Sequence, residues 1–532
     1  MQKRKFEHIP NSSFKTTQYV QNCLSKSINS IAFAQWLDIV DVLALSLVSH
    51  IQYLKCIPLF SMRVTWSFGI FNNRLSNASQ KHVRKLSLGR CDVVDDLHPL
   101  PQGLQELYIE AGHTFAASIH QIPNLKKLRF PGVQSTAMQS KNKHLYLPIS
   151  IETVYLARSG TQCIENMSQL TNLVSLRFPG GFLEEQKFQD LPSSLQRLSL
   201  NCRWGHDMAL LPTTCCLPPA LLQLELLRFS QPLYAHMFPS TLTDLELSSM
   251  NEVWLPNTFP HTLKKLRLNE YNQPLKPNML PPYLEELDIR CFRGYVLEAD
   301  VLPLSLTTLV VGNGFHAPLA QLYTNLTYLN VRARQVFSSS DFPSNLITLQ
   351  LNMGYYCSDD AFAFPDSLQN LTLSGPFHLN AIIPAVNLTT LVLLTSHASL
   401  VDVFPSKLEN LVVKGKSLQH FILPQSVRSL SLDHFTHAQL CQMFHNVDDY
   451  PNLTSLHFGF GFKYKLDGNF VFPKSLLHVD FGMCFNQRIP TKKLPPNIRQ
   501  LTCRSSLHSQ FKNWSFQYCH NQNLPTTSIC FL

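Results

Sequence analysis

Histidine, cysteine and acidic residues are the side chains with which this chain could bind a metal or carry out acid–base chemistry. Its 21 histidines and 14 cysteines are dispersed along the sequence. The tightest pair, His434-Phe-Thr-His437, has no third ligand evident beside it, whereas metal sites commonly use three or four protein ligands. There is no Cys-x-x-Cys pair, no Gly-x-x-x-x-Gly-Lys-Ser/Thr loop and no Gly-x-Gly-x-x-Gly turn. The sequence therefore predicts a solvated loop pair at His434 and His437, no metal or cofactor, and a chain that is not an enzyme.

A second set of residues could recognise another macromolecule. Arginine and tyrosine are favoured at the energetic centres of protein interfaces, and several occur at related positions of a repeated phrase. We predict that a target binds to this set: Tyr108, Lys127, Arg129, Tyr155, Arg177 and Arg197. Acidic residues such as Glu225 and Glu246 follow, and then a nearly uncharged stretch with Val310, Val392 and Val412. The alternative is a solvated sheet face whose valines reflect strand propensity.

The phrase that positions these residues recurs about twenty times along the chain. It reads aromatic or Leu, Pro, two residues, Leu, two residues, Leu, one residue, apolar, as in Phe259-Pro260…Leu263…Leu266…Leu268. Successive copies are about 19 to 26 residues apart, which is the period of leucine-rich-type coils. The central positions are Leu86, Leu107, Leu128, Val154, Leu176, Leu198, Leu224, Leu245, Leu266, Leu287, Leu309, Leu329, Leu349, Leu371, Leu391, Leu411, Leu430, Leu456, Val479 and Leu501.

The phrase has the two-residue alternation of a strand. In Lys265-Leu266-Arg267-Leu268 the leucines are expected to point inward and the charged residues outward. The proline suits the turn that enters the strand, because it has no N–H to donate. A coil of this length returns the chain beside its previous strand. We therefore predict a leucine-rich-repeat-like solenoid, a right-handed coil with a parallel β-sheet on its concave face and mostly irregular returns.

Composition and charge narrow the possible partners and location. The chain has 532 residues and a net charge of +9 that is spread rather than gathered in a basic block, so nucleic acid is not an expected partner. The N-terminus has no apolar core of a signal peptide, and no stretch approaches the ~18 apolar residues of a membrane span. Scattered cysteines favour free thiols in a reducing compartment. We expect an intracellular, cytoplasmic protein (in the host cytoplasm if it is viral) with no membrane contact.

The return segments carry a second signature. Phe229-Ser-Gln-Pro-Leu233, Tyr271-Asn-Gln-Pro-Leu275 and Phe485-Asn-Gln-Arg-Ile489, each followed by Leu-Pro or Phe-Pro, resemble the FNIP repeat of amoebal and giant-virus proteins. The resemblance covers about residues 81–503. The chain departs from the commonest leucine-rich pattern, in which Asn or Cys follows the strand and satisfies backbone groups at the turn.

Residues 28–66 lack the repeated phrase and have the residue pattern of a helix. Asp38 or Asp41 could cap a helix, and Leu43, Leu47 and Ile51 fall on one helical stripe. The order of residues from Leu37 to Ser49 resembles the second half of an F-box, although the Leu-Pro-x-Glu opening is absent. An F-box-like start followed by FNIP-like repeats is itself a family architecture. The resemblance implies that a Skp-family linker binds these residues: Leu37, Asp41, Val42, Leu43, Leu45 and Val48.

These observations define four expected segments: a basic tail (1–27), an F-box-like helical segment (28–66), a solenoid (67–505) and a C-terminal cap or tail (506–532). The resemblance implies a substrate-recruiting adaptor of an SCF-type cullin–RING ubiquitin ligase, with a Skp-family linker, a cullin and an unknown target protein as partners. The alternative is a ligase-independent scaffold whose N-terminal helix only caps the solenoid, as terminal repeats require.

Overall fold

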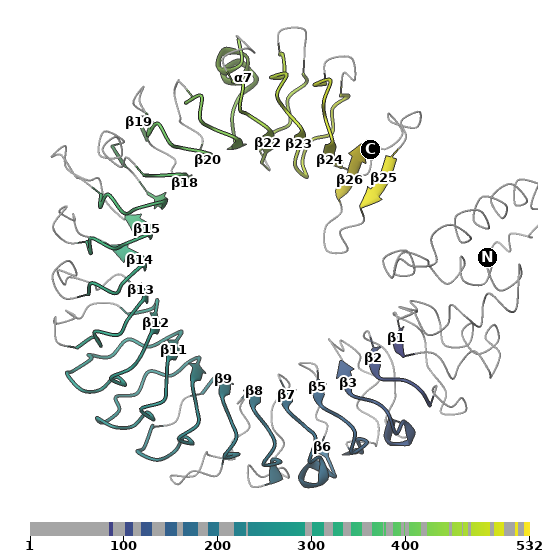
Figure 1. Ribbon diagram of the computed structural model, residues 1–532, viewed down its shortest axis with the longest axis vertical. Coiled ribbons are helices and arrows are strands. Elements are labelled where there is room, and N and C mark those ends of the chain that lie inside the picture. Colours follow the sequence, from purple (N-terminus) through teal and green to yellow (C-terminus); the bar gives the residue numbers. More distant parts are fainter. Residues whose placement is uncertain are drawn as a thin grey trace, which may run out of the picture. The chain divides into compact units, whose positions relative to one another are not determined.

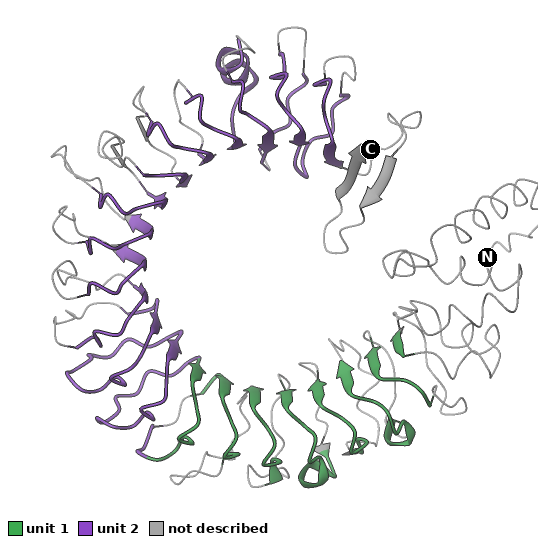
Figure 2. Ribbon diagram, viewed as in Figure 1, with its two compact units in different colours: residues 1–231, 236–247 green, residues 232–235, 248–532 purple. Residues whose placement is uncertain are grey.

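A computed structural model of the protein describes twenty-three stretches of the chain. They are residues 84–88, 102–109, 119–129, 144–156, 163–178, 190–201, 217–229, 232–292, 301–312, 323–333, 342–353, 364–375, 377–378, 387–394, 398–399, 404–415, 423–445, 450–459, 461–466, 470–489, 494–504, 516–519 and 526–531. The chain divides into two compact units, residues 1–231 with 236–247 (unit 1) and residues 232–235 with 248–532 (unit 2) (Figure 2). Among the helices of the described residues, none is both long and apolar enough to cross a membrane.

Unit 1 contains a ladder of parallel strands in which each strand pairs with the next one along the chain. Its strands are β1 (Lys85–Leu88), β2 (Glu106–Ile109), β3 (Lys127–Arg129), β5 (Thr153–Tyr155), β7 (Ser175–Phe178), β8 (Arg197–Asn201), β9 (Gln223–Leu227) and β10 (Asp244–Leu247). The described parts of the return segments include the 3-10 turns η2 (Ile119–Gln121) and η4 (Met167–Gln169) and a small parallel pair, β4 (His144–Leu145) with β6 (Cys163–Ile164). The strands lie along the inner side of the unit's curve (Figure 1).

Unit 2 continues the same pattern over more coils. Its parallel strands are β11 (Lys265–Leu268), β12 (Glu286–Ile289), β13 (Thr308–Val311), β14 (Tyr328–Ala333), β15 (Thr348–Met353), β16 (Asn370–Ser374), β18 (Thr390–Leu394), β20 (Asn410–Lys414), β21 (Ser429–Asp433), β22 (Ser455–Phe458), β23 (His478–Asp480) and β24 (Gln500–Arg504). A short pair, β17 (Phe377–His378) with β19 (Ala398–Ser399), lies in the returns. At the C-terminal end, β26 (Thr526–Phe531) pairs antiparallel with β24 and with β25 (Phe516–Cys519), so this hairpin covers the last strand edge.

The central positions of the repeated phrase form the core of both ladders. All twenty are at most 2% exposed. Consecutive central residues also face each other in register, for example Leu198 with Leu224 in unit 1 and Leu287 with Leu309 in unit 2. Burying a leucine side chain stabilises a fold by roughly 1.5–3 kcal/mol, so the column is a major source of stability. The predicted parallel solenoid and its strand phase are confirmed.

The proline of each phrase begins a tight turn into the strand, as predicted. The backbone N–H of Leu195 donates to the carbonyl of Pro192 at 3.1 Å, and Leu263 donates to Pro260 at 3.0 Å. This i to i+3 hydrogen bond is the bond of a β-turn. The same bond recurs in most coils of the described residues that carry this proline, so proline fixes where each strand starts.

Side chains just before the first leucine tie neighbouring coils together at this turn. Ser194 Oγ donates to the carbonyl of Leu173 at 2.8 Å, Ser367 Oγ to Leu346 at 2.7 Å, and Asn345 Nδ2 to Thr324 at 2.9 Å. A buried carbonyl without a donor costs free energy, so these contacts stabilise the stack. They do so from a different place in the coil than the Asn or Cys of the commonest leucine-rich pattern.

The return segments are closed by large buried side chains. Phe229, Met250, Tyr271 and Phe292 occupy equivalent positions and are at most 1% exposed. In unit 2, Trp254 is 2% exposed, and its Nε1–H donates to the carbonyl of Met279 in the next coil at 3.0 Å. The FNIP-like aromatic residues are therefore core residues of the outer side of the coil.

One expectation about the returns is wrong. His437 is not in a loop but begins the α-helix α7 (His437–Met443). Thr436 caps this helix, because its side chain accepts from the Gln439 N–H while the Gln439 side chain accepts from the Thr436 N–H. Such a reciprocal capping box stabilises a helix start, which the sequence signal at Thr436 and Gln439 could have indicated.

Candidate functional site

Four of the predicted binding residues stand in register on consecutive strands of unit 1. Tyr108 of β2 lies opposite Arg129 of β3, Arg129 lies opposite Tyr155 of β5, and Tyr155 lies opposite Arg177 of β7. Neighbouring strands are separated by about 4.8 Å. We call Tyr108, Arg129, Tyr155 and Arg177 the Tyr–Arg row.

The side chains of the Tyr–Arg row interleave. The guanidinium carbon of Arg129 lies 5.4 Å from the ring centre of Tyr108 and 5.2 Å from that of Tyr155, and Arg177 lies 5.3 Å from Tyr155. These distances are typical of cation–π contacts. Both arginines are exposed and both tyrosines are half-buried. The rings thus hold the guanidinium groups in place while leaving their edges open to a ligand.

Lys127 lies in the adjacent row of side chains and forms an ion pair with Glu106, a residue that the sequence did not mark as part of the site. Glu106 accepts from Lys127 Nζ at 3.2 Å and pairs with Lys85 Nζ at 3.1 Å. Partial burial works to raise the pKa of Glu106, but its hydrogen bonds and charge attraction to Lys85 and Lys127 outweigh burial and lower that pKa. Lys85, Glu106 and Lys127 follow one another at 21-residue steps in the sequence, and this alternation of charge could have indicated that they pair on neighbouring strands. Arg129, by contrast, has no carboxylate partner among the described residues.

The far end of the Tyr–Arg row meets an acidic residue. Arg177 Nη2 lies 3.8 Å from Glu225 Oε1 of β9, which is an ion pair but too long for a hydrogen bond. The pair reaches across β8, whose residue in this row is Ser199. Ser199 is 8% exposed, and its hydroxyl is a buried polar group without a hydrogen-bond partner among the described residues. A buried hydroxyl left in this way calls for an explanation.

Arg197 is the predicted site residue that stands apart from the others. It is exposed and lies in the same row as Lys127, opposite Ser175 on one side and Gln223 on the other. The six predicted target-binding residues therefore occupy two parallel rows, of which the Tyr–Arg row is the more tightly organised. Whether a target binds to any of them stays a prediction.

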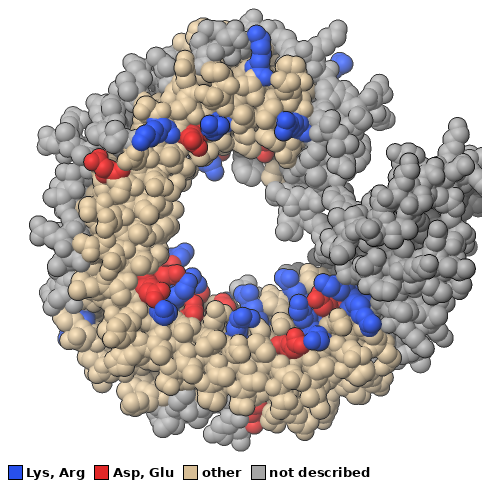
Figure 3. All heavy atoms as spheres, viewed as in Figure 1, with Lys and Arg blue, Asp and Glu red and all other residues tan. Residues whose placement is uncertain are grey.

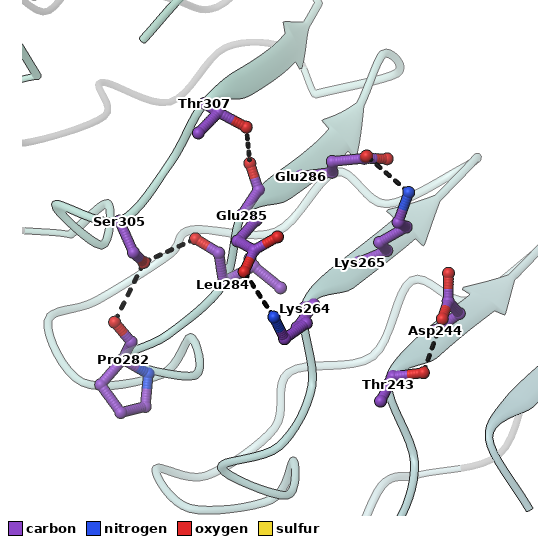
Figure 4. A network of polar contacts seen from close by, with 10 residues as sticks. All are labelled: Thr243, Asp244, Lys264, Lys265, Pro282, Leu284, Glu285, Glu286, Ser305 and Thr307. Carbon is purple, nitrogen blue, oxygen red and sulfur yellow. Dashed lines mark hydrogen bonds and ion pairs between the residues drawn. The ribbon is translucent and has the colours of Figure 1, made fainter. Parts of the chain in front are cut away.

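Unit 2 begins with charges that pair between coils. Lys264 Nζ donates to Glu285 at 2.7 Å, and Lys265 Nζ donates to Glu286 at 2.6 Å (Figure 4). Basic and acidic side chains accordingly lie side by side on the edge that carries the strands (Figure 3). Exposed pairs of this kind contribute ~0–1 kcal/mol each and leave little net charge for a partner.

The following strands of unit 2 present an uncharged face. Asn330 Nδ2 donates to Gln350 at 2.8 Å, and Asn370 donates to the hydroxyl of Thr348 at 3.2 Å. Valines such as Val392, which the sequence assigned to this stretch, lie in the same row and are half-buried. Several of these polar side chains bond to one another and none of them is charged, so this face is less suited than the Tyr–Arg row to bind a charged ligand.

Near the C-terminal end, Ser431, His457 and Asp480 occupy consecutive strands, an order that resembles a catalytic triad. His457 Nδ1 lies 3.8 Å from Asp480 Oδ2, and their side chains are 44% and 36% exposed. The distance is too long for the hydrogen bond that orients a catalytic histidine. No group of three or more metal-binding side chains occurs among the described residues, and the pair His434 and His437 does not form one.

The predicted linker-binding residues cannot be placed in the same way. Leu37, Asp41, Val42, Leu43, Leu45 and Val48 all lie outside the described residues, as does the whole of segment 28–66. Their role in binding a Skp-family linker stays a prediction.

Comparison with known proteins supports the repeat fold. The FNIP repeat family matches residues 254–292, which contain β11 and β12. This match includes the Tyr271–Leu275 signature but is narrower than the resemblance seen in the sequence. No curated protein matches the chain in sequence.

Several solved structures are similar to this chain, and one of them supports its architecture. The crystal structure of CroV588, described as a novel circular LRR protein, is 22% identical, with 80% of this chain and 77% of that chain covered and a TM-score of 0.50. YopM from Yersinia enterocolitica WA-314 is 17% identical over 91% of this chain and 99% of its own (TM-score 0.36). The functional domain of InlJ from Listeria monocytogenes is 14% identical over 79% and 82% (TM-score 0.32). The likeness to CroV588 shows that the chain has the fold of a leucine-rich-repeat solenoid.

Proposed function

We propose that this chain is a non-enzymatic, protein-binding solenoid that holds a target protein on the inner strand face of unit 1. The observation that supports this proposal best is the Tyr–Arg row, in which aromatic and guanidinium groups are held in register on a rigid sheet. Side chains that are already ordered lose little conformational entropy on binding. The exposed guanidinium edges offer paired, charge-assisted hydrogen bonds to a partner.

We further propose that the chain recruits this target to an SCF-type cullin–RING ubiquitin ligase in the cytoplasm. The support comes from the sequence of segment 28–66, which resembles an F-box and would bind a Skp-family linker and, through it, a cullin. In that arrangement the chemistry belongs to other subunits. This chain would act by raising the effective concentration of the target near them.

A second candidate is a ligase-independent scaffold in which segment 28–66 only covers the first coil. This candidate is supported by the C-terminal part of the chain, where the hairpin β25–β26 covers the edge of β24 in the way that segment 28–66 would cover the first coil. Repeat arrays need such covers at both ends, because an open strand edge invites non-specific pairing.

Affinity purification of the full chain, scored for a Skp-family linker and cullin, separates the two candidates. The variant carrying Leu43→Glu and Val48→Glu should lose linker and cullin while its circular dichroism spectrum stays unchanged. The variant carrying Arg129→Glu and Arg177→Glu serves as the matched control and should keep both. Co-purification that survives the first pair of changes would reject the adaptor and favour the scaffold.

The same two arginine changes test where the target binds. They should weaken target capture and leave linker binding intact. If capture persists but fails when Val310, Val392 and Val412 become charged, the target binds unit 2 instead. Retention of a nucleic acid that the arginine changes abolish would favour a nucleic-acid ligand over a protein.

A further inference from the structure

The two arginines of the Tyr–Arg row are separated by a distance that selects one ligand conformation. Arg129 and Arg177 are two strands apart, with Tyr155 between them, which corresponds to about 9.6 Å. Glu225 is two strands beyond Arg177, at about the same interval. The backbone positions of these three residues are therefore equally spaced, and in the free protein the side chains of Arg177 and Glu225 lean together to within 3.8 Å.

A polyproline II segment has side chains with this spacing. It has three residues per turn and rises about 3.1 Å per residue, so every third side chain lies on one face at about 9.3 Å. Same-face side chains of a β-strand recur at about 6.7 Å. Those of an α-helix recur at about 5.4 Å per turn, or 10.8 Å for two turns, a mismatch that accumulates over two intervals.

We propose that unit 1 binds an acidic segment of a target protein in the polyproline II conformation. Carboxylates at positions i and i+3 pair with Arg129 and Arg177, and a basic residue at i+6 pairs with Glu225. This inference rests on the proposed function in so far as the segment belongs to the captured target. It does not depend on the ligase.

The charges around the row favour carboxylates over phosphate groups. Phosphorylated residues carry nearly two charges and are usually held by clustered arginines, whereas these two guanidinium groups stand apart with a ring between them. A nucleic acid is disfavoured for a related reason. Arg129 and Arg177 come from the strands on either side of Tyr155, and both lie over its ring, so they compete with a base for stacking on that ring. The next carboxylates, Glu225 and Glu246, would repel a continuous phosphate backbone.

The contact between Arg177 and Glu225 is suited to being opened by such a ligand. Its 3.8 Å separation makes it a weak internal pair, and each partner would exchange it for a closer contact with the peptide. The pair spans β8, where the buried hydroxyl of Ser199 has no hydrogen-bond partner among the described residues, and we expect that opening the pair exposes this hydroxyl. That hydroxyl can then donate to a carboxylate or carbonyl oxygen of the bound segment, which explains why it is tolerated.

The test uses the full chain and two labelled peptides of identical composition. One has the order Glu-Pro-Pro-Glu-Pro-Pro-Lys, and the other has the order Glu-Pro-Glu-Pro-Pro-Pro-Lys. Fluorescence anisotropy at low salt should show that the first peptide binds at least about tenfold more tightly, because only it places both carboxylates on the arginines. Affinity should fall as salt rises, since the contacts are ionic.

Substitutions locate the peptide. Arg129→Gln and Arg177→Gln should each weaken binding of the first peptide about tenfold. The matched control Arg499→Gln, an exposed arginine of unit 2, should change it less than about twofold. Ser199→Ala should weaken binding without lowering the unfolding midpoint, because the hydroxyl has no partner among the described residues of the free protein. Circular dichroism of each variant verifies that it is folded.

Three results would overturn the proposal: equal binding of the two peptides, binding only when serine phosphates replace the glutamates, or displacement of the peptide by oligouridylate at the same arginines. These outcomes are separate from the fate of the proposed function. If the peptide fails while linker and target are still captured, this inference alone is wrong. If the peptide binds but no linker is captured, the adaptor role is wrong and the peptide site stands.

Discussion

Trp254 should be one of the most stabilising side chains of unit 2, and its contribution can be divided by substitution. It is 2% exposed, its ring centre lies 4.5 Å from that of Tyr271 in the next coil, and its Nε1–H donates to the carbonyl of Met279. Trp254→Ala removes the ring and the donor together. Trp254→Phe keeps an aromatic ring but removes the donor.

The structure sets the expected magnitudes. Trp254→Ala should lower the free energy of unfolding by ~3–5 kcal/mol, the usual cost of truncating a buried aromatic residue. Trp254→Phe should cost ~1–3 kcal/mol, because the Met279 carbonyl loses its donor in a buried site. A double-mutant cycle with Tyr271→Leu should show a coupling of ~0.5–1.5 kcal/mol for the ring pair.

Urea unfolding followed by circular dichroism gives these free energies, and hydrogen exchange of β11 and β12 shows whether the loss is local, as expected for stacked repeats. The matched control is the neighbouring Leu255→Ala. Because Leu255 is 75% exposed, this change should stay within ~0.5 kcal/mol. If Trp254→Ala costs no more than Leu255→Ala, the coils are not held together by their outer aromatic residues, and the reasoning fails.

Three further predictions concern other parts of the chain. In the native protein, the ionised Glu106 should contribute a small part of the free energy of unfolding above the ordinary pKa of a glutamate, and this part is lost as pH falls through the lowered pKa of the folded state. Glu106→Gln should remove this pH-dependent contribution, and an unchanged pH profile of unfolding would contradict the prediction. Gly459→Ala should destabilise unit 2 by ~1–3 kcal/mol, measured by urea unfolding, because an added Cβ would lie 2.3 Å from Cγ of the buried Asp433. Cys503 should resist alkylation at pH 8.5 until the protein unfolds, because burial, followed by the nearby Asp480 charge, raises its pKa to about 11; rapid labelling of the native protein would refute this.

The N-terminal segment and the inner strand face can be tested independently of each other. The resemblance of segment 28–66 to an F-box concerns residues outside the described part of the chain, so it depends on the linker experiment alone. Target binding at the Tyr–Arg row depends on geometry that the ladder of unit 1 supplies. Failure of one prediction leaves the other untouched.

Residue type and spacing were sufficient to predict the repeat, the phase of the strands and the core. Each phrase has leucine at a fixed place and polar residues on either side of it, so only one face of the strand can be buried. A shift of the strand by one residue would expose the leucines to solvent. The proline ahead of each strand marked the turn. For these reasons the central residues from Leu86 to Leu501 could be assigned from the repeated phrase alone, and all are buried.

Which polar side chains meet depends on the way the coils stack. Lys127 and Arg129 are two residues apart and both are basic, yet Lys127 forms an ion pair with Glu106 whereas Arg129 lies between two tyrosine rings. Coil lengths vary, and a polar side chain can turn toward either neighbouring strand, so spacing alone does not choose its partner. The ion pair between Arg177 and Glu225, which spans the strand of Ser199, is one contact that spacing alone did not identify. Apolar burial is set by residue type and period, whereas polar contacts depend on distances that exist only after the coils have stacked.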